Sequence, residues 1–104
     1  MATTTELAHL IDINLRSALN EVTDLPSYLS ESETASIHIR IGWLYEWEDM
    51  VDRIEWLARQ FQNGDMSDKQ AERYRELVEA LRKNLPILRT LEWPIPLVAV
   101  ESST

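Results

Sequence analysis

The stretch that decides the fold is residues 36–61, SIHIRIGWLYEWEDMVDRIEWLARQF. Placed at 100° per residue, most of its apolar side chains share one arc of about 140°, which is typical of a helix that packs on a core. That arc holds Ile39, Trp43, Leu44, Trp47, Met50, Val51, Ile54, Leu57, Ala58 and Phe61. A smaller apolar group, consisting of Ile37, Ile41, Tyr45 and Trp56, lies on the opposite, acidic side. We therefore expect a long amphipathic helix with aromatic surface on both sides.

The beginning of this stretch also fits a half-buried strand, because its isoleucines alternate with other residues. Two features favour a helix. Ser30 and Glu33 have the spacing of a capping box, and no turn separates residues 36–42 from the helix that follows.

A second long helix is expected directly after the first. Asn63-Gly64 can supply the left-handed residue that ends a helix, and Ser67 with Gln70 forms a capping pair that starts the next one. This next helix has a single apolar stripe, made of Ala71, Tyr74, Leu77, Val78, Leu81 and Leu85. A short loop between two amphipathic helices predicts an antiparallel hairpin of residues 36–62 and 67–85. The expected fold class is all-α, a small helical bundle built on this hairpin.

An N-terminal helix should complete the bundle. Thr3 and Glu6 have capping-box spacing, and a run of apolar residues beginning at Leu7 keeps to one face as far as Val22. Pro26 disfavours helix at the residue before it, so the pattern is expected to break there.

The C-terminal part contains three prolines that limit helix formation. Pro86 should kink or end the second hairpin helix, with a bent continuation to about Leu91. The segment that follows is expected to be extended, and residues 97–100 could form a strand. We therefore divide the chain into one helical domain, residues 1–92, and an extended tail, residues 93–104.

The composition narrows the class of function. The net charge is −8, and the basic residues alternate with acids, so we expect no direct binding to nucleic acid. There is no cysteine, which removes disulfides, thiolate metal sites and cysteine nucleophiles. No signal-peptide pattern and no membrane-span-length apolar run is present, so a cytoplasmic protein that does not contact membrane is expected.

Two groups of residues are candidate metal ligands. Glu6 and His9 form a Glu-x-x-His pair, an arrangement used by ferritin-like di-iron bundles, but the sequence has no second copy of it. Glu48, Asp52 and Glu55 align three carboxylates on one side of a helix, and Mg²⁺ or Ca²⁺ take oxygen ligands of this kind. Both groups also fit a solvated helix surface, and a metal site would need completion in an oligomer.

No catalytic motif is visible, so we expect a non-enzymatic protein without a cofactor that binds a protein partner, itself, or both. Inhibitor, immunity and adaptor proteins have this acidic helical profile, and acidic mimicry of nucleic acid is a further alternative. The large apolar residues outside the main stripes are the candidate partner-binding residues: Tyr45, Trp56, Trp93, Ile95, Leu97 and Val98. Three helices have little capacity to bury all of this surface, so a homodimer or larger assembly is expected.

Overall fold

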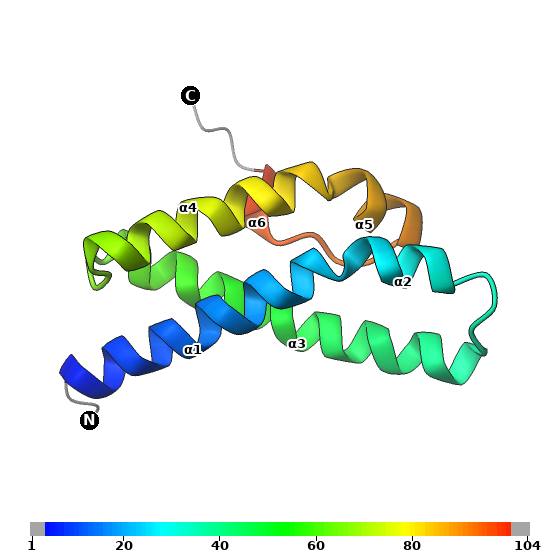
Figure 1. The fold of residues 1–104 in the computed structure, drawn as a ribbon, viewed down its shortest axis with the longest axis horizontal. Coiled ribbons are helices and arrows are strands. Elements are labelled where there is room, and N and C mark those ends of the chain that lie inside the picture. Colours follow the sequence, from blue (N-terminus) through cyan, green and yellow to red (C-terminus); the bar gives the residue numbers. More distant parts are fainter. Residues whose placement is uncertain (1–3, 101–104) are drawn as a thin grey trace.

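The computed structural model describes residues 4–100, and these form an all-α bundle without strands, as predicted (Figure 1). Its helices are α1 (Thr4–Thr23), α2 (Leu25–Glu31), α3 (Ile37–Gln62), α4 (Asp68–Lys83), α5 (Leu85–Leu91) and α6 (Leu97–Val100). None of the helices in this part of the chain is both long enough and apolar enough to cross a membrane.

The first two helices form one bent rod. The break falls at Asp24, and Leu25 already belongs to α2, so the chain bends near Pro26 but does not leave the helical conformation. Proline is tolerated here because it occupies the first turn of α2, where a backbone N–H has no partner within the helix. The predicted capping residue Thr3 lies outside the described residues.

The predicted hairpin is confirmed to within two residues at each end, and residues 37–42 are helical rather than extended. The predicted cap of α3 is wrong. Ser30 belongs to α2, and the Ser36 hydroxyl instead accepts a hydrogen bond from the backbone N–H of Ile39 at 3.3 Å. At the other end, Gly64 has a φ of +78°, which permits the tight connection to α4.

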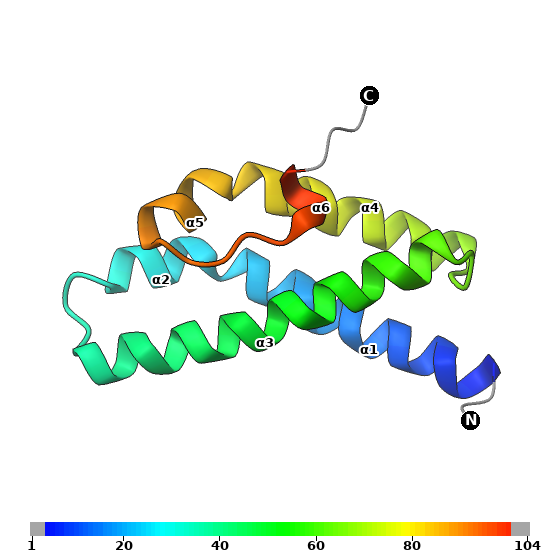
Figure 2. The same ribbon diagram turned by 180° about the vertical axis from the view of Figure 1, so that it is seen from behind.

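α3 and α4 lie closest near their connection and diverge away from it, while α1 packs across both of them (Figures 1 and 2). The main core is built from one face of each long helix. Its fully buried side chains include Ile11, Leu15, Trp47, Ile54, Leu57, Leu77 and Leu81. The molecule measures only 17 Å along its shortest axis, so the helices form two thin layers with much exposed surface.

The chain after α5 turns back into the wedge between α3 and α4 (Figure 2). The turn is made by Glu92, which has a left-handed backbone (φ 60°), and by Trp93, whose N–H donates to the Leu88 carbonyl at 3.0 Å. This is the hydrogen-bond pattern that commonly ends helices at a left-handed residue. Residues 97–100 form the short helix α6, so the prediction that they are extended is wrong.

Gln70 joins α4 to α1 and is the one polar side chain among the described residues that is buried. Its Nε2 donates to the Ala8 carbonyl at 2.9 Å and to Asp12 Oδ1 at 2.8 Å. Its Oε1 accepts from the Ser67 N–H at 3.0 Å, which completes the predicted capping box. One side chain therefore caps α4 and fixes its position against α1.

We expect Gln70→Ala to lower the free energy of unfolding by about 2 kcal/mol, because a cap and two interhelical hydrogen bonds are lost together. Gln70→Glu separates the two roles. It keeps the capping acceptor but removes both donors and places a carboxylate next to Asp12. At neutral pH it should therefore destabilise at least as strongly as alanine, whereas a cap-only role predicts little change. Urea unfolding followed by circular dichroism measures both variants.

Candidate functional site

The structure does not bring the candidate metal ligands together. His9 is exposed on α1, and Glu48 and Asp52 are exposed on α3. Within residues 4–100 no group of three or more histidine, aspartate or glutamate side chains lies close enough to hold a metal ion. A site formed by Glu6 and His9, or by Glu48, Asp52 and Glu55, would therefore need ligands from a second molecule.

The C-terminal segment covers the protein's own core. Trp93 is only 9% exposed, Pro96 and Ala99 are buried, and Ile95 and Val98 are half-buried against the core. Trp93 was predicted as a partner-binding residue, and intramolecular contacts cover most of its ring, so little of it is left to contact a partner. Leu97 remains largely exposed.

Trp93 belongs to a cluster of four aromatic rings from three parts of the chain. It stacks on Trp47 of α3 with ring centroids 6.0 Å apart, and it contacts Tyr28 of α2 at 5.6 Å. Tyr28 in turn lies 5.1 Å from Trp43 of α3. The Trp47 Nε1–H donates to the Pro94 carbonyl at 2.8 Å. The cluster fastens the returning segment to α2 and α3.

The pKa of Tyr28 lies above its ordinary value. Burial raises its pKa, and a hydrogen bond from its hydroxyl to Glu21 Oε1 at 2.9 Å raises it further, since ionised tyrosine could not donate to the carboxylate. The neutral phenol is therefore the form that the fold favours.

We expect Tyr28→Phe to reduce stability by about 1 kcal/mol at neutral pH through loss of this hydrogen bond. The folded pKa lies above the unfolded value of about 10, so the contribution is fully present below pH ~10 and is lost as the pH rises beyond it. The stability difference between wild type and variant should hence shrink above pH ~10. Urea unfolding at pH 7 and pH 11 checks this, and a constant difference would contradict the role of the hydroxyl.

The outer face of α3 is the most prominent exposed apolar surface of the described residues. We use this term for the side turned away from the core, made of Ile37, His38, Ile41, Gly42, Tyr45, Glu48, Asp49 and Asp52, all of which are exposed. The exposed fractions of Ile37, Ile41 and Tyr45 are 55%, 40% and 66%. These three residues are spaced i, i+4, i+8, so they form one row along the helix.

Among residues 4–100, no other helix covers this row. The N-terminal half of α3 forms the lower edge of the molecule in Figures 1 and 2, and α1 crosses α3 only further along the helix. Trp56, predicted as a partner-binding residue on the same side of α3, is half-buried beside Asn14 of α1 and packs against the core. Tyr45 is thus the predicted residue that the structure leaves most exposed.

Gly42 belongs to the outer face, and its role there was not recognised from the sequence. A glycine inside a helix costs roughly 1 kcal/mol relative to alanine. A Cβ at this position would meet nothing within 4 Å, so no contact within the chain requires glycine. The signal was present in the sequence, since this is the one glycine within a 26-residue helix.

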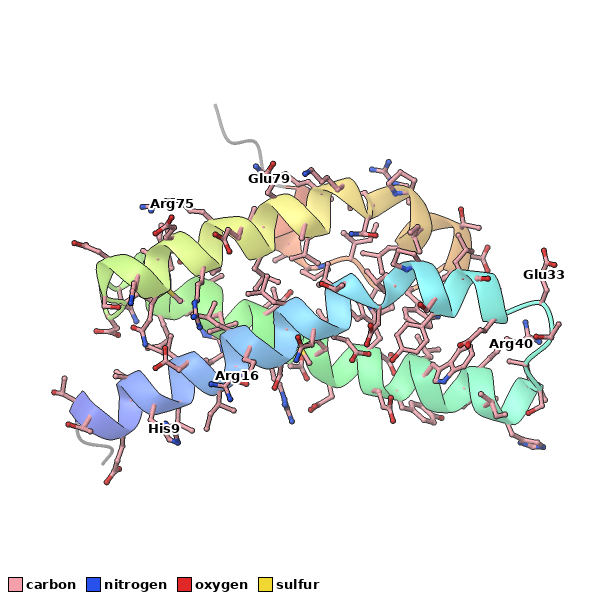
Figure 3. The ribbon with its side chains drawn as sticks, in the orientation of Figure 1. His9, Arg16, Glu33, Arg40, Arg75 and Glu79 are labelled. Atoms are coloured by element: carbon pink, nitrogen blue, oxygen red, sulfur yellow. The ribbon has the colours of Figure 1, made fainter. Side chains whose placement is uncertain are left out.

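Charge is unevenly distributed along α3. Its first turn contains no acidic residue, and the basic side chains His38 and Arg40 lie at this end. Glu46, Glu48, Asp49 and Asp52 follow in the middle of the helix, where Arg53 pairs with Asp49 at 3.1 Å. Figure 3 shows Arg40 close to the loop that precedes α3. The positive end of the helix dipole therefore has no acidic partner in its own first turn.

A shallow groove of about 420 Å³ adjoins this surface. It is lined by Ile37, Arg40, Ile41 and Leu44 of α3 and by residues 90–93 at the end of α5. The groove extends the apolar surface around the side of α3. The polar side chains that line the groove are Ser32, Arg40, Thr90 and Glu92.

Comparisons with known proteins give no match to this chain among protein-family models, curated proteins or solved structures.

Proposed function

We propose that this protein is a small, acidic, non-enzymatic interaction module that binds a protein partner through the outer face of α3. The observation that carries the proposal is the row of Ile37, Ile41 and Tyr45, exposed on a helix whose opposite side packs on the core from Trp43 onward. Large apolar side chains that form a continuous exposed row, rather than single exposed residues, are typical of interaction surfaces.

Two further features support the proposal. Tyrosine is favoured at interfaces because it buries a large area with few rotatable bonds and keeps a polar group for hydrogen bonding. The surrounding carboxylates give the apolar row a charged rim, which is common at protein interfaces. The proposal includes a cytoplasmic location, as expected from the sequence.

The test is affinity capture from source-cell lysate with three proteins. These are wild type, the α3 variant Ile41→Glu/Tyr45→Glu, and a control variant Leu10→Glu/Ile13→Glu. The control changes two residues of α1 that are also exposed: the exposed fraction is 44% for Leu10 and 40% for Ile13. All three proteins should show the same unfolding midpoint within about 3 °C, because exposed substitutions change stability little.

The proposal expects that wild type and the α1 control retain the same specific protein, including further copies of this chain, and that the α3 variant does not. Equal capture by all three proteins would place the interaction elsewhere. Absence of any specific capture, including self-capture, would refute the interaction role.

A further inference from the structure

We infer that the partner of the outer face of α3 is the same face of a second copy, paired antiparallel in a two-fold symmetric dimer. This inference rests on the proposed function and names the partner for the same surface. A two-fold interface uses one patch twice, so the patch must be complementary to itself. The outer face of α3 meets this requirement in both charge and shape.

The charge distribution selects the antiparallel orientation. One end of the face has the helix N-terminus and His38, with Arg40 nearby, and the other end has Glu48, Asp49 and Asp52. Antiparallel pairing places the carboxylates of each copy beside the α3 N-terminus of the other, with Arg40 nearby, and not beside the carboxylates of the other copy. Carboxylates near a helix N-terminus are stabilising because they lie beside the positive end of the helix dipole. Parallel pairing would align acids with acids and one helix N-terminus with the other.

The register follows from the shape of the face. Opposite each Tyr45, an antiparallel helix must offer space for a large ring. Gly42 is the one residue of the outer face without a side chain, so it offers this space. Placing Tyr45 of one copy over Gly42 of the other puts the two-fold axis level with the midpoint between residues 43 and 44. The same register brings His38 opposite Asp49 of the second copy. In this register the Tyr45 ring of the second copy occupies the space beside Gly42. This gives a reason for a glycine at position 42 that no contact within one chain gives.

The size of the face predicts a weak dimer. Residues 37–52 span about 24 Å of helix at 1.5 Å per residue. One such helix pair buries less than the roughly 800 Å² per partner of a standard interface. We therefore expect a dimer that dissociates in the micromolar range, an order-of-magnitude expectation for interfaces at the small end. Concentration then controls whether the face is paired.

Sedimentation equilibrium of the purified wild type tests the pairing. The mass should rise with concentration from 12.1 kDa toward twice that value. Tyr45→Glu should weaken self-association at least tenfold, and Gly42→Leu should also weaken it, although leucine is the better helix former. Leu10→Glu, on α1, should leave it unchanged. A wild type that stays monomeric at millimolar concentration would overturn the inference, as would dimerisation that is insensitive to Tyr45→Glu.

The antiparallel orientation of the two helices is tested separately with introduced cysteines. The chain contains no cysteine of its own, so each variant has a single thiol. His38→Cys and Asp49→Cys chains are mixed at concentrations where wild type is dimeric and are then oxidised. Antiparallel pairing predicts disulfides between the two different chains and little disulfide within either one alone. Disulfides that form mainly between identical chains would contradict it.

The two proposals fail in distinguishable ways. A monomeric wild type that still captures a lysate protein through Ile41 and Tyr45 refutes the second copy as partner but retains the interaction function. A dimer that is unaffected by these residues refutes the pairing of the outer faces. The proposed function is refuted separately, if the Ile41→Glu/Tyr45→Glu variant captures the same proteins as wild type.

Discussion

A chain that ends at Glu92 is expected to lose most of its stability. Its missing segment contains the buried Trp93, Pro96 and Ala99, and its removal also exposes Trp47 of α3 to water. Burial of large apolar side chains stabilises by about 1.5–3 kcal/mol each, and ordering the segment offsets part of this. We expect a net loss on the order of 4 kcal/mol, against a total of about 5–15 kcal/mol for a domain of this kind.

Thermal unfolding of the truncated chain measures this loss, and two full-length variants separate its causes. Trp93→Ala should reproduce a large part of it through the lost ring contacts, whereas Leu97→Ser should change stability by less than about 0.5 kcal/mol because Leu97 is 62% exposed. A truncated chain with wild-type stability would show that the segment is an independent tail.

Trp47→Ala is expected to destabilise the protein by about 3–5 kcal/mol, the range for large aromatic residues deleted from cores. The Trp47 side chain is completely buried, stacks on Trp93 and donates its Nε1–H to the Pro94 carbonyl at 2.8 Å. The substitution leaves a cavity and removes the donor to this carbonyl. At about 4–8 °C per kcal/mol, the melting temperature should fall by more than about 12 °C.

Two control variants locate the origin of this effect. Trp47→Phe keeps an aromatic ring but lacks the donor, so it should cost about 1–3 kcal/mol. Trp56→Ala on the same helix removes a half-buried indole and should cost clearly less than Trp47→Ala. Equal losses for Trp47→Ala and Trp56→Ala would contradict the central position of Trp47.

The long helices could be predicted from sequence because their apolar periodicity and their core faces coincide. Leu77 and Leu81, for example, lie in the predicted stripe and are completely buried. The cap formed by Ser67 and Gln70 was also predictable, since it depends on local spacing. Its second role, the pair of hydrogen bonds to α1, joins residues 58 and 62 positions apart and leaves no local signal.

The returning segment was harder to predict for the same reason. Its prolines correctly indicate the absence of a long helix, but the turn depends on Glu92, a non-glycine residue in a left-handed conformation that L side chains rarely adopt. The burial of Trp93 depends on a wedge between α3 and α4 that exists only in the folded protein. Periodicity could not show whether this ring contacts its own chain or another.

The outer face of α3 was only partly predictable. Sequence periodicity placed Ile37, Ile41, Tyr45 and Trp56 opposite the core face, but it could not show that α1 reaches Trp56 and leaves the other three uncovered. Which part of a long helix is covered depends on where neighbouring helices cross it. That information belongs to the tertiary structure.

The most direct test of the interaction surface is hydrogen exchange of the wild-type backbone amides at low and high protein concentration. We predict that exchange of residues 40–49 slows with increasing concentration, because pairing of the outer faces opposes local opening of α3. The amides of α4 should exchange at the same rate throughout. Protection that increases on α1 around Leu10 and Ile13, with residues 40–49 unchanged, would contradict the assignment of the outer face of α3 as the interaction surface.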